Sequence, residues 1–190
     1  MNTRVLALAT ACCVVWASTA ASQDDMSAHH AHTDSTHADS MHADSAFSAL
    51  QRRGRTAMGV DQYTSAHHFV VLEDGGRIEL QRDVEDSAGI QQIRRHLRSV
   101  ARSFAAGDFT TPGFVHDRVV PGTAVMAARR ALIRYDVVDL PRGGAIRITT
   151  SDDQALRAVH DFLRFQASDH RTGDSSRVSS PEHAHHPVPQ

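Results

Sequence analysis

The sequence contains no lysine and only two cysteines, and both scarcities limit its chemistry. All twenty basic residues are arginine, a bias that we attribute to genomic base composition and not to function. Cys12 and Cys13 both fall within an N-terminal segment that has the pattern of a signal peptide. We therefore expect a mature chain without thiols, which excludes a cysteine nucleophile, a thiolate metal site, an iron–sulfur cluster and a disulfide.

Residues 1–21 are typical of a signal peptide. Arg4 supplies a positive charge, residues 5–16 form a short apolar run, and the small residues Ser18, Thr19 and Ala20 follow. The apolar run is too short for an ordinary membrane-spanning helix, and no later segment is apolar enough to form one. We predict export to a periplasmic or secreted location, with no stable membrane insertion once the peptide is removed.

Charge and composition separate a domain from two tails. Residues 22–45 form an arm with five Asp and no Arg, whereas residues 46–171 carry eighteen Arg against fifteen acidic residues. This excess of three is too small to indicate nucleic-acid binding. The arm has no branched aliphatic or aromatic side chain, and the tail over 172–190 is rich in Ser and Pro. We expect both to be disordered, because neither can offset its ordering entropy by burial.

Within residues 46–171 one pattern occurs twice. Strand-like runs at 67–72 and 77–81 flank a Gly-Gly turn, and Asp86 or Ser87 can cap an amphipathic helix that follows. The second copy has strands at 131–140 and 145–150, and Ser151 or Asp152 as the cap of a last helix. We predict a single α+β domain in which two β-β-α units form an antiparallel sheet with helices on one face. Additional helices are predicted around 47–56 and 122–130.

Three segments resemble a group of small exported bacterial proteins of unknown function. These are MGVDQYTSAHHF, FAAGDF and VHDFLRFQASDHRTGD, and the resemblance covers roughly residues 58–174. It implies the same domain and the same compartment. It supplies no activity and no site residues that could be transferred to this chain.

The arm contains HTDSTHADSMHADS over residues 32–45, in which a His-x-Asp-Ser unit recurs every five residues. Five residues turn a helix by about 140° and alternate between the faces of a strand, so this period suits neither element. It does provide an imidazole with a carboxylate two residues away, and a flexible chain can fold several such units around one Cu(II), Ni(II) or Zn(II) ion. We predict a metal-collecting arm with the ligands His29, His30, His32, His37 and His42.

Other features bear on this hypothesis. Met26 and Met41 add thioethers, so we favour copper over zinc or nickel. An independent cluster near the C-terminus, His183, His185 and His186, adds three candidate ligands. The alternative is that the HADS copies arose by repeat slippage and form a polar linker in a module that binds a partner without metal.

The domain contributes histidines of its own. His68 and the preceding histidine are adjacent at a strand start, so they should point to opposite faces. His160 is predicted to face solvent, whereas His170 continues the apolar stripe of the last helix and should point toward the sheet. A metal site made of His68, His96 and His170 is a further hypothesis. The alternative is that these side chains are satisfied at the margin of the core.

Catalytic motifs are absent from the sequence. There is no G-x-S-x-G, no H-E-x-x-H and no Gly-rich phosphate loop. Asp161 and Asp169 are predicted to be solvated charges, as is the face formed by Arg94, Arg95, Arg98 and Arg102. We therefore favour an exported, non-enzymatic protein that binds, buffers or delivers a transition metal. An interaction module without metal is the alternative, and a small metal-dependent enzyme is a third hypothesis.

Overall fold

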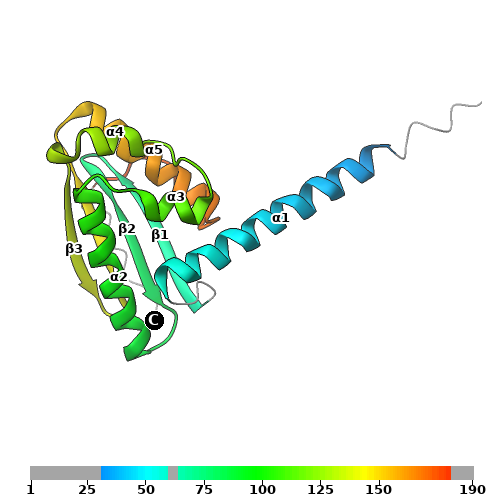
Figure 1. Cartoon of the computed structure of the whole chain (residues 1–190), viewed down its shortest axis with the longest axis horizontal. Helices are drawn as coiled ribbons and strands as arrows, with labels where there is room; N and C mark the ends of the chain where they lie inside the picture. The colour runs from blue at the N-terminus through cyan, green and yellow to red at the C-terminus, as the bar shows by residue number, and fades with distance from the viewer. Residues whose placement is uncertain (1–30, 60–63, 181–190) are drawn as a thin grey trace, which may run out of the picture. The chain divides into compact units, whose positions relative to one another are not determined.

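The computed structural model describes the chain over residues 31–59 and 64–180. Its elements follow the order that the two β-β-α units predict, with additional short helices between them (Figure 1). The elements are α1 (Ala31–Met58), β1 (Ser65–Leu72), β2 (Gly75–Arg82), α2 (Ser87–Ala105), α3 (Thr110–His116), α4 (Thr123–Ala128), η2 (Arg130–Leu132), β3 (Arg134–Leu140), β4 (Gly143–Thr149) and α5 (Asp153–Asp169).

The four strands form one antiparallel sheet in the order β1-β2-β4-β3. Phe69 pairs with Ile78, Ile78 with Ile146, and Ile146 with Val137, so one apolar row crosses the whole sheet. Ile146 is fully buried in this row. The predicted α+β class and two-layer arrangement are therefore confirmed.

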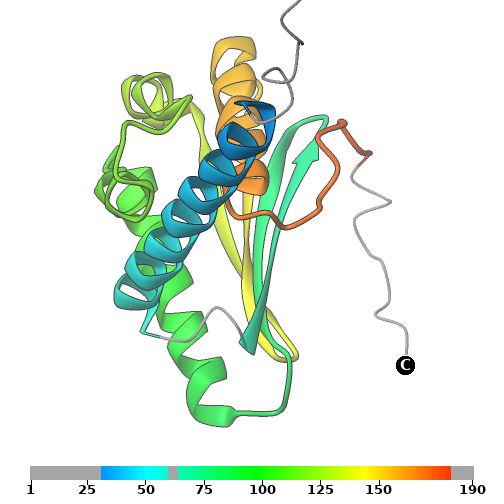
Figure 2. The same cartoon turned by 90° about the vertical axis from the view of Figure 1, so that its right-hand side faces the viewer.

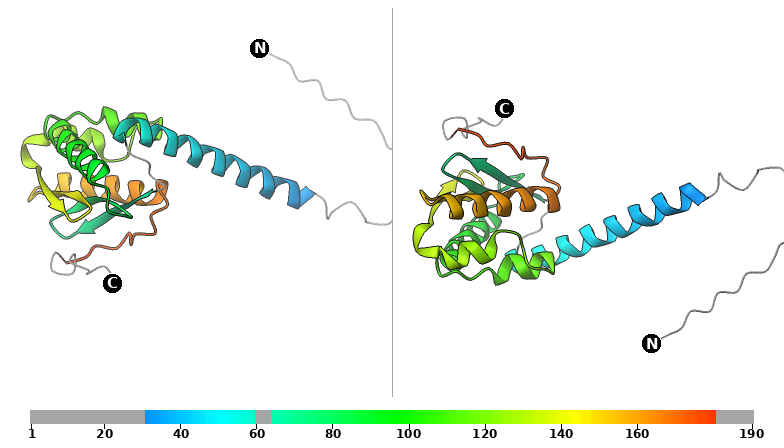
Figure 3. Two further views of the ribbon diagram at one scale, coloured as in Figure 1. Left: turned by 90° about the horizontal axis from the view of Figure 1, so that it is seen from below. Right: turned by 90° about the horizontal axis from the view of Figure 1, so that it is seen from above.

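The helices α2 and α5 cover the apolar face of the sheet (Figures 1 and 3). Of the two predicted caps for each helix, Asp86 accepts a hydrogen bond from the Gly89 N–H and Asp152 accepts one from the Ala155 N–H. The main sheet contacts of α2 are with β3 and β4, whereas those of α5 are with β1 and β2. Each helix thus packs on the hairpin of the other unit.

The segment between α2 and β3 holds more helix than we predicted. The predicted helix at 122–130 is present as α4, and Gly122 precedes it with φ +81° at a point where a Cβ atom would collide with the backbone of α5. The helix α3 was not predicted, because Thr-Thr-Pro-Gly within it has low helix propensity. The strand β3 begins at Arg134 and not at residue 131, because the chain first forms the short helix η2.

The backbone of α1 is helical from Ala31, which differs from the disorder that we expected over residues 22–45. The second half of α1 packs on the domain through Leu50 and Met58, which are both buried. Once this half is formed, the helix can extend toward the N-terminus without a second costly nucleation step. A sequence without an apolar face can therefore remain helical. Residues 22–30 of the arm lie outside the described residues. No helix within the described ranges is both long and apolar enough to cross a membrane.

Residues 172–180 belong to the domain, although we placed them in the C-terminal tail. The Asp174 carboxylate accepts a hydrogen bond from the Phe69 N–H at 2.8 Å, and the Ser179 N–H donates to the Val71 carbonyl at 2.9 Å. Figure 2 shows this segment passing beside β1. It satisfies backbone groups on an edge strand that would otherwise be open to pairing with another chain. Residues 181–190 lie outside the described residues.

Candidate functional site

Four histidines from different parts of the fold line one small cavity, which we call the histidine pocket. His67 comes from β1, His96 from α2, His116 from the end of α3, and His170 from the residue that follows α5. The cavity has a volume of about 80 Å³. Its remaining walls are largely apolar and include Met58, Phe69, Ile78, Val100, Phe104, Val115 and Phe162.

His170 lies at the centre of this group of rings. Its ring centroid is 5.3 Å from that of His67, 5.1 Å from that of His116 and 5.4 Å from that of Phe69. The backbone N–H of His170 caps α5 by donating to the Gln166 carbonyl at 3.0 Å. The end of α5 therefore fixes where this imidazole enters the pocket.

The pocket favours the neutral form of His67, His96 and His170. Burial, together with the neighbouring histidines, lowers the pKa of His67 to about 4 and the pKa of His170 to about 3. Burial also lowers the pKa of His96. An imidazolium in this apolar space would lose its hydration and repel its neighbours. At neutral pH these rings are uncharged and can donate or accept hydrogen bonds, or coordinate an ion.

His116 is held more firmly than the other three. Its Nδ1 lies 2.5 Å from a carboxylate oxygen of Asp169, and its Nε2 lies 2.9 Å from the amide oxygen of Gln166. Asp169 also accepts a hydrogen bond from Arg118 at 2.9 Å, and the Arg118 guanidinium stacks over the ring of Phe165. Asp169 is thus a structural anchor and not the solvated charge that we predicted, because α3 and the loop after it lie against the end of α5.

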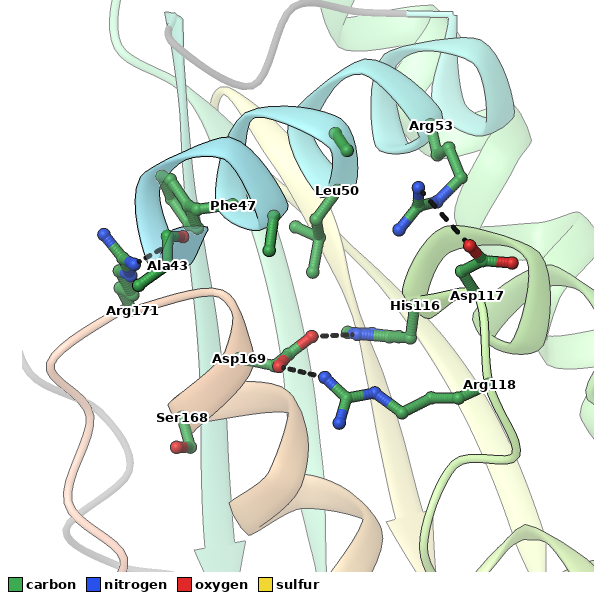
Figure 4. Close-up of a pocket in the computed structure, with 12 residues that line it drawn as sticks. Ala43, Phe47, Leu50, Arg53, His116, Asp117, Arg118, Ser168, Asp169 and Arg171 are labelled. Atoms are coloured by element: carbon green, nitrogen blue, oxygen red, sulfur yellow. Dashed lines mark hydrogen bonds and ion pairs between the residues drawn. The ribbon is translucent and has the colours of Figure 1, made fainter. Parts of the chain in front are cut away.

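On its other side, His116 borders a larger opening, which we call the arginine cleft (Figure 4). The cleft has a volume of about 460 Å³ and lies between α1, the end of α3 and the end of α5. Its charged side chains are Arg53, Arg118, Arg171, Asp117 and Asp169. Its apolar wall comes from α1 and consists of Ala43, Ala46, Phe47, Ala49 and Leu50.

The predicted domain site is only partly assembled. His96 and His170 line the histidine pocket together, but His68 points to the opposite face, where its Nδ1 lies 2.8 Å from Asp174. This contact raises the pKa of His68. The pocket instead contains His67, the neighbour of His68, and His116. Strand alternation predicts that one of His67 and His68 faces the pocket, but it does not say which one. His116 could not be predicted in the pocket, because its position depends on α3, which was not predicted.

Other sequence predictions also need correction. His160 is buried and not exposed to solvent, because its Nε2 lies 2.8 Å from the Leu72 carbonyl where the end of β1 meets this flank of α5. Asp161 is exposed, as predicted. The arginine face of α2 is only partly solvated, since Arg94 donates to the carbonyls of Leu140 and Gly143 at the turn of the β3–β4 hairpin.

The predicted ligands in the tails are mostly beyond what the structure describes. His29, His30, His183, His185 and His186 lie outside the described residues, and only the helical backbone is described at His32, His37 and His42. Over residues 31–59 and 64–180, the described side chains include no group of three or more His, Cys, Asp or Glu that could hold a metal ion.

The chain was also compared with known proteins. No family model matches it, and neither a curated protein nor a solved structure shows significant similarity to it. The fold and the two cavities are therefore interpreted from their own geometry.

Proposed function

We propose that this chain is an exported protein that binds and buffers a transition metal, and that the His-rich arm collects the ion. The observation that carries the proposal is the HTDSTHADSMHADS repeat, which places an imidazole and a carboxylate together three times in fourteen residues. Imidazole is a good ligand for Cu(II), Ni(II) and Zn(II), and the thioethers of Met26 and Met41 favour copper.

The contacts of the domain histidines support the proposal that the arm, and not the domain, collects the ion. His68 is held by Asp174, His116 by Asp169 and Gln166, and His160 by the Leu72 carbonyl. These imidazoles already have partners whose loss would cost stability. The arm and the C-terminal cluster supply imidazoles at high local density, and they require no rearrangement of the sheet.

A second candidate function is an interaction module without metal. The observation in its favour is that Arg171 contacts the C-terminal end of the arm, which here forms part of α1. Its guanidinium donates to the Ala43 carbonyl at 3.1 Å, pairs with Asp44 at 3.3 Å and stacks over the Phe47 ring. An arm that is built into a helix can present a surface to a partner.

Metal titration of the full mature chain distinguishes the two functions. We expect reversible binding of Cu(II), Ni(II) or Zn(II) by calorimetry, and loss of most of it when His29, His30, His32, His37 and His42 are all changed to Ala. Binding should also weaken between about pH 7 and 5, because a coordinating imidazole with an ordinary pKa of about 6.5 must be neutral.

A matched variant with His68→Ala and His160→Ala should keep the stoichiometry. Unchanged stoichiometry in the five-histidine variant would contradict the proposal, and no binding by the wild type would favour the interaction module.

A further inference from the structure

We propose that the arginine cleft is a binding site for a small organic monocarboxylate with an apolar body. This site is separate from the metal-collecting arm, and the inference does not depend on the proposed function. It rests on the volume of the cleft, on the state of its arginines and on its apolar wall.

The cleft is large enough for a small organic ligand. Its volume of about 460 Å³ falls within the range of roughly 300–1,000 Å³ that is usual for small-molecule sites. Like such sites, it combines an apolar wall with a few convergent polar groups. Three of its residues, His116, Arg118 and Asp169, are already joined in one hydrogen-bond network.

Two guanidinium groups point into the cleft on either side of His116 (Figure 4). Arg53 extends from α1, and its Nε donates to the Val115 carbonyl at 2.8 Å. Arg118 extends from the loop after α3, and one of its NH2 groups donates to Asp169 at 2.9 Å. A guanidinium has five N–H donors in a rigid fork, so both groups retain donors that can face a ligand.

The charges around the cleft leave room for one negative charge. Arg118 is neutralised by Asp169 at 2.9 Å, and Arg171 is paired with Asp44 at 3.3 Å. Among the residues that the structure describes, the acidic partner of Arg53 is Asp117, which is 4.0 Å away with a side chain that is 83% exposed. Such a distant and solvated partner contributes little. A single carboxylate can therefore bind Arg53 in a bidentate manner, whereas a phosphate dianion would bring a second charge toward Asp117 and Asp169.

The apolar wall, which lies on the same helix as Arg53, fits a hydrocarbon group. Along α1, Ala43, Ala46 and Ala49 line the cleft with small side chains, and Phe47 and Leu50 complete its apolar surface. The alanines leave the cleft open. An apolar body can bury the exposed side chains of Ala43 and Ala46 and the part of Phe47 that is still exposed, at roughly 25 cal/mol per Å², whereas Leu50 is already buried beneath them. A small inorganic anion would leave this wall exposed to water.

The test uses hexanoate and its uncharged analogue hexanamide as probes, titrated by ligand-observed NMR into the metal-free full mature chain. The two probes share the apolar body and differ in the charged group. We expect saturable binding of hexanoate with at least tenfold higher affinity than hexanamide. Equal affinity of the two probes, or no saturable binding of hexanoate, would overturn the proposal.

Two variants locate the site. Arg53→Gln should weaken hexanoate binding at least tenfold, and Ala46→Phe, which fills the cleft and keeps every charge, should abolish the binding of both probes. The matched control is Arg134→Gln, which removes an arginine paired with Asp136 on β3 and should leave the affinity unchanged. Thermal unfolding checks that each variant is folded. If Arg53→Gln is not folded, Ala46→Phe still tests the location of the site. Wild-type affinity in Ala46→Phe would place the binding elsewhere and overturn the assignment.

Inorganic phosphate separates a carboxylate site from a general anion site. We expect phosphate to displace hexanoate only at concentrations far above that of hexanoate. Displacement at equal concentrations would show that the arginines bind anions without regard to the apolar wall, and it would overturn the monocarboxylate assignment.

Discussion

At the scale of single residues, two imidazoles of the histidine pocket, those of His67 and His170, have strongly lowered pKa values. His67 and His170 have pKa values near 4 and 3, and both rings lie against Phe69. Their packing favours the uncharged form because an apolar surface cannot replace the hydration of an imidazolium. These two residues therefore link the stability of the domain to pH.

We expect acid to destabilise the domain through this pocket. In the unfolded chain a histidine titrates near 6.5, so between about pH 6.5 and 4 the unfolded state binds more protons than the folded state. The free energy of unfolding should thus decrease as the pH is lowered over this range, by up to about 1.4 kcal/mol per pH unit for each such group. His170→Gln should flatten this dependence in urea unfolding measured at several pH values without metal. A slope equal to that of the wild type would contradict the assignment.

The matched variant for this experiment is His68→Gln. Asp174 raises the pKa of His68, so the stability from this pair is fully present below about pH 6.5 and is lost as pH rises through the raised pKa. His68→Gln should therefore change the slope above pH 6.5 and leave it unaltered between pH 6.5 and about 5, which is above the range where Asp174 titrates; the pKa of Asp174 is itself lowered in part by His68. The two histidines thus act in separate pH ranges.

A second substitution at the same position tests whether His170 has a structural role. His170→Ala removes ring contacts with His67, Phe69 and His116. We expect it to lower the free energy of unfolding by about 1–3 kcal/mol, whether or not metal is present. Chemical denaturation with and without Cu(II) provides the measurement. A loss of stability that appears only with metal would indicate a ligand.

At the scale of elements, α1 joins two segments of different character. Its second half is anchored by Leu50 and Met58, and its first half consists of the His-x-Asp-Ser repeats. Successive repeat positions on a helix differ by about 140° of rotation. An ion that gathers several of these imidazoles must therefore unwind the helix upstream of the anchored half.

Metal binding should accordingly reduce the helix content. If the arm collects the ion as proposed, Cu(II) should weaken the circular dichroism signal at about 222 nm, the usual helical band, and the five-histidine variant should show no such change. The near-ultraviolet signal of the aromatic side chains, which lie mainly in the domain, should stay constant. Increased helicity on metal binding would mean that the repeats coordinate the ion as a helix, contrary to this prediction.

At the scale of the whole molecule, local pattern predicted the sheet and the two covering helices. Strand alternation, the two Gly-Gly turns and the Asp caps are all short-range signals. Other features depend on contacts between distant residues, such as the pairing of Asp174 with Phe69 and the position of His116 beside Asp169. The histidine pocket could not be predicted as a unit. Its four histidines come from four separate parts of the fold, and their spacing in the sequence does not indicate that they lie close together.

The crossed packing of the two units makes the domain a single cooperative structure. Leu97 of α2 and Leu163 of α5 are both buried, and each helix makes its main sheet contacts with the hairpin of the other unit. Neither β-β-α unit keeps its full core when it is separated from the other. We therefore expect Leu97→Ala and Leu163→Ala each to lower the free energy of unfolding by about 2–5 kcal/mol.

The two leucine variants should shift one common unfolding transition, because a loss of packing in either unit exposes the sheet that both units share. The measurement is guanidinium unfolding followed both by circular dichroism and by tyrosine fluorescence. Tyr135, on β3, packs against Phe104 of α2 and so reports the contact between the units. Val138→Ala is the matched control, since Val138 is 48% exposed on the edge strand β3 and should change stability by only about 0.5 kcal/mol or less. Two separate transitions, or a leucine variant that melts only its own unit, would show that the β-β-α units fold independently.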